Sequence, residues 1–186
     1  ALSYAIDRDT LTRTVLRDTA IPAYSITPPD TLGYNPPKLF SFDPEQARAL
    51  LAEAGYPDGQ GWPGLEITYN TNEDHRKIAV AVQQMWKDEL GIDVSITNQE
   101  WKVYLNTVSQ GEFQVARRGW IGDYVDANNF LDLFLANGGN NNTGYANAEF
   151  DDIILNQAPK AASREERYQL FFQAETMMMQ EMPIIP

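Results

Sequence analysis

The sequence predicts an α/β fold: a mixed sheet with a parallel βαβ core, flanked by helices. Residues 65–69 and 92–96 each alternate apolar and polar side chains, as half-buried strands do. The segment 73–90 between them repeats apolar residues with a helical period. Short joints on both sides of this helix make the strands parallel, because a full helix returns the chain to the same end of the sheet. The 186 residues suit one domain over 1–186.

The residues before this core predict helices joined by a proline-rich loop. Apolar residues between 2 and 17 follow a helical period, and Asp9 or Thr10 is suited to cap a second helix there. Five prolines between 20 and 42 predict an extended loop, because proline fixes φ and lacks an N–H donor.

A capped helix leads from this loop towards the first strand. Asp43 is suited to its N-cap, proline follows at the first helical position, and Gly55 is placed to end it. After the second strand, the pattern predicts a helix over 100–110 that ends at glycine, then a third strand of the same sheet over 113–117.

The last third of the chain predicts helices without strands. Residues 126–136 are helical in pattern, and the Asn/Gly-rich residues 137–144 predict a loop. A short helix over 149–158 has its cap near Asn147. A serine at 163 with a glutamate three residues later forms a capping box, which predicts a final helix to about residue 181.

Composition excludes several classes of function. The chain has no Cys and one His, which rules out disulfide scaffolds, thiol catalysis, iron–sulfur clusters and zinc sites built on Cys or several His. We therefore expect no metal and no cofactor. The net charge of −12 makes nucleic acid a poor partner, because phosphate contacts need clustered Lys and Arg. No apolar run approaches the roughly 20 residues of a membrane span.

The two ends suggest a piece of a longer protein. The sequence starts at Ala1 without an initiating Met or a signal peptide. It finishes in the apolar run Met182–Pro186, which is typical of a segment that leads into a buried strand. We expect further chain on at least one side.

Candidate binding residues follow the predicted strands. The loops after the three strands hold His75, the tryptophans Trp101 and Trp120, and the glycine-flanked Asp123. Ligands of open parallel sheets bind outside the carboxyl ends of the strands, so we expect these side chains along one edge.

The run from Arg117 to Tyr124 is the most informative of these loops. Glycines beside Trp120 allow another backbone to approach, so an extended ligand can pair with this segment. A carboxylate at Asp123 is suited to an ammonium, and Arg117 to a carboxylate. A tight turn with Trp120 in the core is the alternative, just as His75 can be a plain surface residue and Trp101 a core anchor.

Five runs carry a resemblance to a known family: Ala1–Arg8, Leu51–Tyr56, Tyr69–Thr71, Asn98–Lys102 and Gly119–Tyr124. Over essentially its whole length the chain resembles the C-terminal lobe of the oligopeptide-binding proteins, which are extracytoplasmic solute receptors of bacterial ABC importers in solute-binding protein family 5. The resemblance implies one lobe of a periplasmic-binding-protein type II-like fold.

The resemblance also implies a peptide site. Its residues are His75, Trp101, Arg117, Gly119, Trp120, Ile121 and Asp123. It implies that Asp123 receives the peptide's α-ammonium and that Arg117 or His75 meets the C-terminal carboxylate, depending on peptide length. The backbone around Gly119 pairs with the peptide main chain, and the two tryptophans line side-chain pockets. Members of that family have a disulfide cysteine at the position of Ile121, which is absent here.

The expected function is therefore binding rather than catalysis. The expected partners are a short peptide, the missing N-terminal lobe and a membrane ABC permease, in a periplasmic or extracytoplasmic location that is compatible with a lipid anchor. One alternative is a family member for another solute, such as a nickel chelate, an opine or an oligosaccharide. A second is a hydrolase that uses Asp123 with Asp126 or Glu100. A third is a purely structural interaction domain.

Overall fold

The computed structural model describes residues 1–186, and they divide into two compact units. The first comprises Ala1–Pro22 and Phe40–Gly119 and is called the sheet unit here. The second comprises Ala23–Leu39 and Trp120–Pro186 and is called the helical unit. The sequence predicts a single domain over 1–186, and this stays a prediction.

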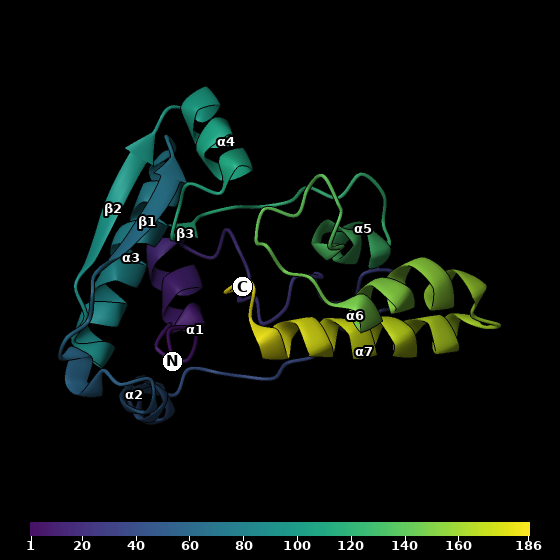
Figure 1. Cartoon of the computed structure of the whole chain (residues 1–186), viewed down its shortest axis with the longest axis horizontal. Coiled ribbons are helices and arrows are strands. Elements are labelled where there is room, and N and C mark those ends of the chain that lie inside the picture. The colour runs from purple at the N-terminus through teal and green to yellow at the C-terminus, as the bar shows by residue number, and fades with distance from the viewer. The chain divides into compact units, whose positions relative to one another are not determined.

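The sheet unit is built on three parallel strands (Figure 1). They are β1 (Leu65–Asn70), β2 (Val94–Gln99) and β3 (Val115–Ala116), in the order β2-β1-β3. β1 pairs in parallel with β2 and with β3. The predicted βαβ core is confirmed. Both pairings are parallel because each connection is a helical crossover, so these three strands form a parallel sheet where a mixed one was expected.

The strands differ in extent from the sequence prediction. β1 buries Ile67, Thr68 and Tyr69 consecutively, without alternation, because it is the central strand. β2 starts at Val94, two residues later than predicted, because the chain must first leave the left-handed helix cap at Gly91. β3 is reduced to two residues at the edge of the sheet.

Helices α3 (Glu73–Leu90) and α4 (Trp101–Gln110) flank the sheet. α3 contacts β1 and β2, and α4 contacts β1. Asn72 caps α3 by accepting hydrogen bonds from the backbone N–H groups of Asp74 and His75, and Glu100 caps α4. Both helices end at glycines with positive φ, as their sequences predict. The caps fix where the loops after β1 and β2 begin.

The N-terminal helix of the sheet unit is shorter than predicted. It comprises α1 (Arg8–Thr10) and the π-helical turn η1 (Leu11–Val15). The expected cap at Asp9 or Thr10 is wrong: Asp7 is the N-cap, and its carboxylate accepts from the Thr10 N–H at 2.9 Å. Its side chain therefore satisfies the first free N–H groups.

Helix α2 (Pro44–Glu53) and the 3-10 turn η2 (Pro57–Gly59) complete the sheet unit. Asp43 caps α2 and proline occupies its first turn, which confirms the sequence prediction. No helix in the structure has both the length and the apolar character needed to cross a membrane.

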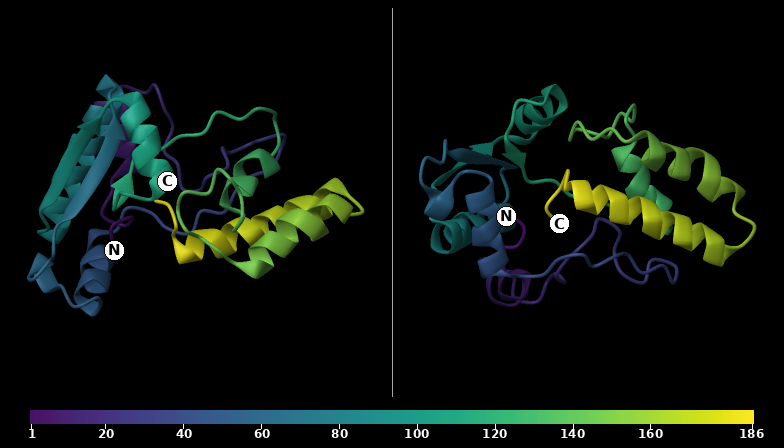
Figure 2. Two further views of the ribbon diagram at one scale, coloured as in Figure 1. Left: turned by 45° about the horizontal axis from the view of Figure 1, so that its top comes forward. Right: turned by 60° about the horizontal axis from the view of Figure 1, so that its bottom comes forward.

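The helical unit contains the remaining helices. They are α5 (Asn128–Leu131), η3 (Asp132–Phe134), α6 (Ala148–Asp152), η4 (Ile153–Gln157), η5 (Ala158–Lys160) and α7 (Arg164–Glu181). α6 and its continuation run beside α7 (Figures 1 and 2). Asn147 and Ser163 cap α6 and α7 as predicted. The helix expected over 126–136 is shortened to 128–134, with Asp126 outside it.

A buried carboxylate ties the loop of residues 23–39 to α7. Glu175 is completely buried. It accepts hydrogen bonds from Ser25 Oγ at 2.6 Å, from the Thr27 N–H at 2.9 Å and from Tyr34 Oη at 2.7 Å. The loop has neither helix nor strand, but it bends and turns between residues 24 and 34, so the expected extended conformation is wrong for that stretch. Glu175 supplies the acceptor for the backbone N–H of Thr27 and for two hydroxyl groups of the loop.

Candidate functional site

The carboxyl ends of the strands bring three predicted residues to one edge of the sheet unit. β1, β2 and β3 are parallel, so they end at the same edge. His75 lies in the first turn of the helix after β1, Trp101 begins the helix after β2, and Arg117 follows β3 directly. Trp120, Ile121 and Asp123 belong to the helical unit.

His75 is a neutral imidazole held beside the end of β1. Its Nδ1 lies 2.9 Å from Asn70 Oδ1, and the amide oxygen accepts, so Nδ1 carries the proton. Burial lowers the pKa of His75 below 6.5, and the positive charge of Arg117 lowers it further. The other ring nitrogen is left to meet a ligand.

Arg117 is a half-buried cation without a carboxylate partner. Its backbone N–H donates to Thr68 O at 2.9 Å, which extends the β3 pairing, and its carbonyl accepts from Tyr104 Oη. Burial lowers the pKa of the guanidinium, but an arginine stays charged at neutral pH. An unpaired cation in this setting is suited to bind a carboxylate bidentately.

Gly119 lies against the same guanidinium. A Cβ at this position would lie 3.5 Å from Arg117 Nη1, which is an ordinary van der Waals distance, so the guanidinium does not itself require glycine here.

Trp101 is exposed, so the alternative of a core anchor is wrong. Half of it, 52%, is accessible to solvent. Its ring stacks on Tyr104 with centroids 6.1 Å apart and planes at 21°. Tyr104 is buried and holds the Arg117 carbonyl, so the Trp101 ring rests on a fixed support. Its open surface offers an apolar wall to a side chain of a ligand.

The segment from Arg118 to Gly122 has a free backbone. None of its N–H or C=O groups forms a hydrogen bond within the chain. Ile121 is 91% exposed. Segments of this kind can pair with an extended ligand through main-chain hydrogen bonds.

Asp123 closes this segment with an exposed carboxylate that forms neither a hydrogen bond nor an ion pair. A second carboxyl, Asp132, lies near it: burial raises the pKa of Asp132, and the negative charge of Asp123 raises it further. No Lys or Arg neutralises either group. This part of the helical unit is therefore suited to an ammonium.

Asn129, which the sequence analysis did not single out, organises this part of the helical unit. The half-buried Trp120 donates its Nε1–H to Asn129 Oδ1 at 2.6 Å, and the Asp123 N–H donates to the same oxygen at 3.4 Å. No motif distinguishes Asn129 from the other asparagines nearby, because its partners are six and nine residues away.

The two carboxyl partners considered for hydrolysis have other bonds. The Asp126 carboxylate accepts hydrogen bonds from Nη1 and Nη2 of Arg167, at 2.6 and 2.9 Å. Glu100 caps α4 and accepts from the Lys102 N–H at 2.8 Å. Neither is available as a free general base beside Asp123.

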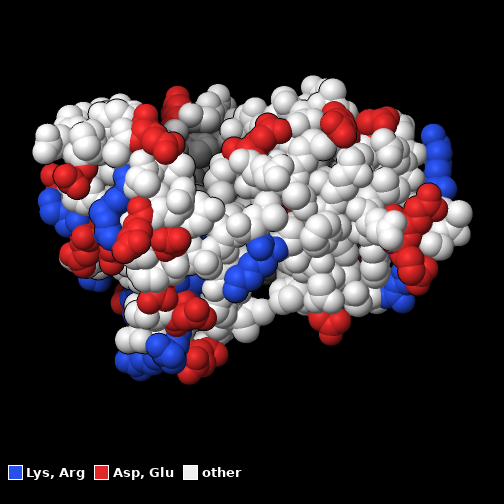
Figure 3. All heavy atoms as spheres, turned by 90° about the horizontal axis from the view of Figure 1, so that it is seen from below, with Lys and Arg blue, Asp and Glu red and all other residues white.

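The chain is acidic and has no cluster of potential metal ligands. Figure 3 shows acidic side chains over the face it presents, with no continuous basic patch, in keeping with the net charge of −12. No group of three or more His, Asp or Glu side chains is arranged to hold a metal ion.

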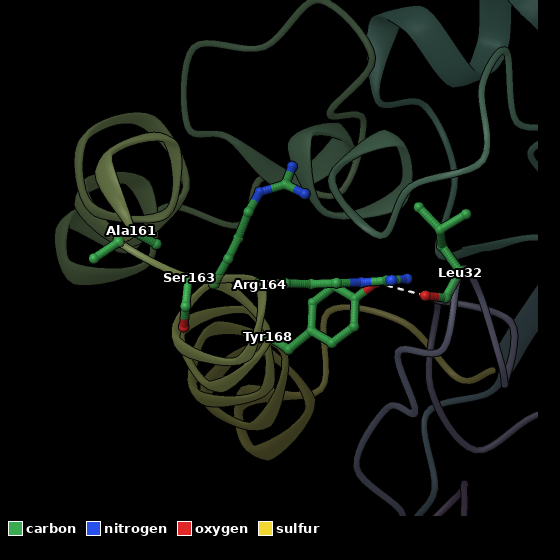
Figure 4. A pocket seen from close by; sticks show the side chains of 7 residues that line it. Leu32, Ala161, Ser163, Arg164 and Tyr168 are labelled. Carbon is green, nitrogen blue, oxygen red and sulfur yellow. Dashed lines mark hydrogen bonds between the residues drawn. The ribbon is translucent and has the colours of Figure 1, made fainter.

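The helical unit also contains a cavity of about 500 Å³ at the start of α7 (Figure 4). Its lining residues are Leu32, Ala161, Ala162, Ser163, Arg164, Arg167 and Tyr168. Arg164 Nε donates to Tyr168 Oη at 2.8 Å, and Tyr168 Oη donates to Leu32 O at 2.7 Å. None of the predicted binding residues lines this cavity.

Comparison with known proteins gives consistent matches. Bacterial extracellular solute-binding proteins, family 5 (middle region), match residues 1–142. The chain is 37% identical to the oligopeptide-binding protein OppA of Bacillus subtilis and 39% identical to the periplasmic murein peptide-binding protein MppA of Escherichia coli. Both matches cover all of this chain and 35% of the relative, so the chain spans about a third of their length.

Solved structures agree with these matches. The structure of the E. coli murein tripeptide-binding protein MppA superposes with a TM-score of 0.91 at 38% identity, over 100% of this chain and 37% of that one. A Haemophilus influenzae OppA in complex with the peptide RPPGFSPFR gives 0.85 at 36% identity, over 95% and 36%. Relatives named for other solutes also match, among them a probable deoxycholate-binding periplasmic protein of E. coli, 34% identical over the whole of this chain.

Proposed function

The chain belongs to the family 5 bacterial extracellular solute-binding proteins, and on this premise we propose that it forms the C-terminal, ligand-binding lobe of an oligopeptide receptor for an ABC importer. Relatives that are named oligopeptide-binding proteins, and a neighbour solved with a bound peptide, support this proposal. The chain spans about 35% of its relatives' length, so a second lobe and a membrane permease are partners within the same proposal.

The observation that carries the proposal is the free backbone of Arg118–Gly122 next to the free carboxylate of Asp123. An extended peptide offers the two matching features, a main chain with unpaired N–H and C=O groups and a terminal α-ammonium. In this proposal the ammonium binds Asp123, and the main chain pairs with the backbone at Gly119, Trp120 and Ile121.

The residues at the edge of the sheet unit take the rest of the peptide. Arg117 is a cation without a partner, so it meets the C-terminal carboxylate of peptides of one length. His75 meets the carboxylate of peptides of another length when its ring is protonated, because the neutral ring with its proton on Nδ1 offers only an acceptor at Nε2. Trp101 and Trp120 form walls of side-chain pockets.

Binding through the main chain explains how such a receptor accepts many sequences, because every peptide has the same backbone. Water in the pockets satisfies varied polar side chains at little cost. In the proposed receptor this lobe and the missing lobe close on the peptide by a hinge motion, and the permease recognises the closed form.

We propose that the protein binds its ligand and does not act as an enzyme. The family and the relatives are binding proteins, and the carboxyl groups considered as catalytic partners of Asp123 are engaged in an ion pair and a helix cap. Relatives named as periplasmic proteins support an extracytoplasmic location, with or without a lipid anchor.

The test is isothermal calorimetry on the full-length protein with a free tetrapeptide and its N-acetylated twin. We expect tight binding of the free peptide and a loss on acetylation. Asp123→Asn should cost about 2–5 kcal/mol with the free peptide, because it removes the partner of a desolvated charge. Asp30→Asn, an exposed aspartate of the same unit, is the matched control.

Each other outcome contradicts a stated part of the proposal. Equal binding of the two peptides leaves a peptide receptor but removes Asp123 as the ammonium anchor. No binding of either contradicts the peptide ligand and favours another solute, as in the relative named for deoxycholate. Turnover of the peptide or of a glycoside contradicts a purely binding role.

A further inference from the structure

Asn129 is an interior polar residue that holds two points of the Asp123 loop. It is 3% exposed. Its single amide oxygen accepts from Trp120 Nε1 at 2.6 Å and from the Asp123 backbone N–H at 3.4 Å. One buried acceptor therefore joins a side chain and a main-chain group three residues apart, and both would be left without a partner if it were removed.

Asn129 is itself fixed to the rest of the helical unit. Its backbone N–H donates to the Asp126 carbonyl at 3.1 Å. The Asp126 carboxylate accepts from the N–H of Asn128, the first residue of α5, at 2.9 Å. The same carboxylate accepts hydrogen bonds from Nη1 and Nη2 of Arg167 on α7, at 2.6 and 2.9 Å. A continuous series of hydrogen bonds thus runs from α7 through Asp126 to the loop.

The loop also packs closely against α5. A Cβ at Gly122 would lie 3.3 Å from the ring of Phe130, so glycine is needed for this approach unless the ring shifts. Asp123 directs its carboxylate to solvent, and that carboxylate has no bond of its own to hold it. The backbone therefore fixes the point from which the Asp123 side chain projects, and Asn129 and the packing on Phe130 hold that backbone.

We infer that Asn129 is the positioning residue of the ammonium site: its amide oxygen sets the backbone of Trp120–Asp123 so that the Asp123 carboxylate faces the ligand's charged amino terminus. This inference rests on the proposed function, because it assumes that Asp123 receives the ammonium. The same hydrogen bond orients the Trp120 ring, so Asn129 also sets one wall of a side-chain pocket.

The test uses Asn129→Leu in the full-length protein, which keeps the size of the side chain and removes the acceptor. Calorimetry compares a free tetrapeptide with its N-acetylated twin, so the readout is the factor by which acetylation weakens binding. We expect this factor to fall about tenfold, which corresponds to the loss of about one hydrogen bond's contribution. The indole N–H resonance of Trp120, assigned by its absence in Trp120→Phe, should shift in the same variant.

Asn147→Leu is the matched control, since Asn147 is an asparagine of the same unit whose amide oxygen caps α6. It should lower thermal stability while leaving the acetylation factor and the Trp120 resonance unchanged. A variant that only loses stability is therefore distinguished from one that loses the positioning of Asp123, because only the second changes the acetylation factor and the Trp120 resonance.

The possible results separate the two claims. An acetylation factor that stays the same in Asn129→Leu overturns the role of Asn129 and leaves the proposed function intact. If acetylation has no effect in the unmodified protein, the ammonium site at Asp123 is wrong, and the role of Asn129 falls with it. Should Asn129→Leu fail to fold, Asn129→Ser, whose hydroxyl is too short to reach both donors, is judged by the same two readouts.

Discussion

Replacing Glu175 by leucine should detach the loop of residues 23–39 from α7. The carboxylate is completely buried and is the acceptor for Ser25 Oγ, the Thr27 N–H and Tyr34 Oη. Leucine fills a similar volume but accepts nothing. The change therefore tests the hydrogen bonds rather than the packing.

The magnitude follows from the three donors. A buried donor left without an acceptor costs about 1–3 kcal/mol. The Thr27 N–H is a backbone group and cannot turn to another acceptor, whereas the hydroxyls of Ser25 and Tyr34 rotate and recover part of the loss. Leucine also relieves the cost of burying an ionised carboxylate, which offsets the total. We expect a net loss of about 3 kcal/mol from the free energy of unfolding of the helical unit.

The pH dependence of this site has a definite sign. Burial raises the pKa of Glu175 above its ordinary value of 4.5, against the effect of its hydrogen-bond donors. A raised pKa means that the folded state binds the proton more tightly than the unfolded state. The stabilisation is present below pH 4.5 and is lost as the pH rises through the folded-state pKa. Glu175→Gln, which does not titrate, should gain stability relative to the unmodified protein over that window.

Hydrogen exchange measured by mass spectrometry is the assay, because it reports on residues 23–39 separately from the rest of a longer protein. Glu175→Leu should speed exchange at Thr27 and lower the unfolding temperature. Glu165→Leu, the same change at an exposed site on α7, should do neither. Unchanged protection at Thr27, or a Glu175→Gln variant that loses relative stability as the pH rises, would refute the reasoning.

Four further predictions concern the sheet unit and the Asp126 ion pair. Gly91 and Gly111 both end helices at positive φ, but a Cβ at Gly91 would lie 2.7 Å from Asp58 O whereas one at Gly111 would meet nothing within 4 Å. Gly111→Ala should therefore cost about 1–2 kcal/mol in urea unfolding, and Gly91→Ala clearly more; equal losses would contradict the close approach. The lowered pKa of His75 keeps it neutral at pH 7, so peptides whose carboxylate meets it should bind more tightly as the pH falls through the pKa of His75, an effect absent in His75→Gln. Arg117→Ala should weaken the binding of peptides of one length more than the binding of other lengths, as measured by calorimetry. Equal weakening for all lengths, or for none, would exclude the idea that Arg117 and His75 bind the carboxylates of peptides of different lengths. Arg167→Met should cost about 1–3 kcal/mol in thermal unfolding by leaving Asp126 half-buried and unpaired, and a double-mutant cycle with Asp126→Asn should recover part of that loss.

Features determined by neighbouring residues were predictable. The bounds of α3 follow from an asparagine before it, a glycine after it and an apolar face between them, and all three act within a few residues. The parallel pairing of β1 and β2 follows from the helix that joins them. Because parallel strands end at one edge, the placement of His75, Trp101 and Arg117 after neighbouring strand ends was predictable as well.

Features that depend on where side chains reach were less accessible. The periodicity of the first helix does not show that Asp7 is its cap, because Asp7, Asp9 and Thr10 are all good caps and only the backbone path selects one. The early start predicted for β2 has a similar origin. Apolar alternation begins at Ile92, but the turn out of the Gly91 cap delays the pairing until Val94.

The sequence by itself determined the α/β class, the βαβ core, the caps of α2, α6 and α7 and the loop that contains Asp123, because these depend on period, propensity and residues close in the chain. Only the tertiary structure decided which polar side chains support that loop and the loop of residues 23–39. Asn129 reaches back to Trp120, Arg167 reaches Asp126 across 41 residues, and Glu175 meets Ser25 across 150. Such contacts depend on the packing of distant elements, and a single sequence has no local pattern that marks them.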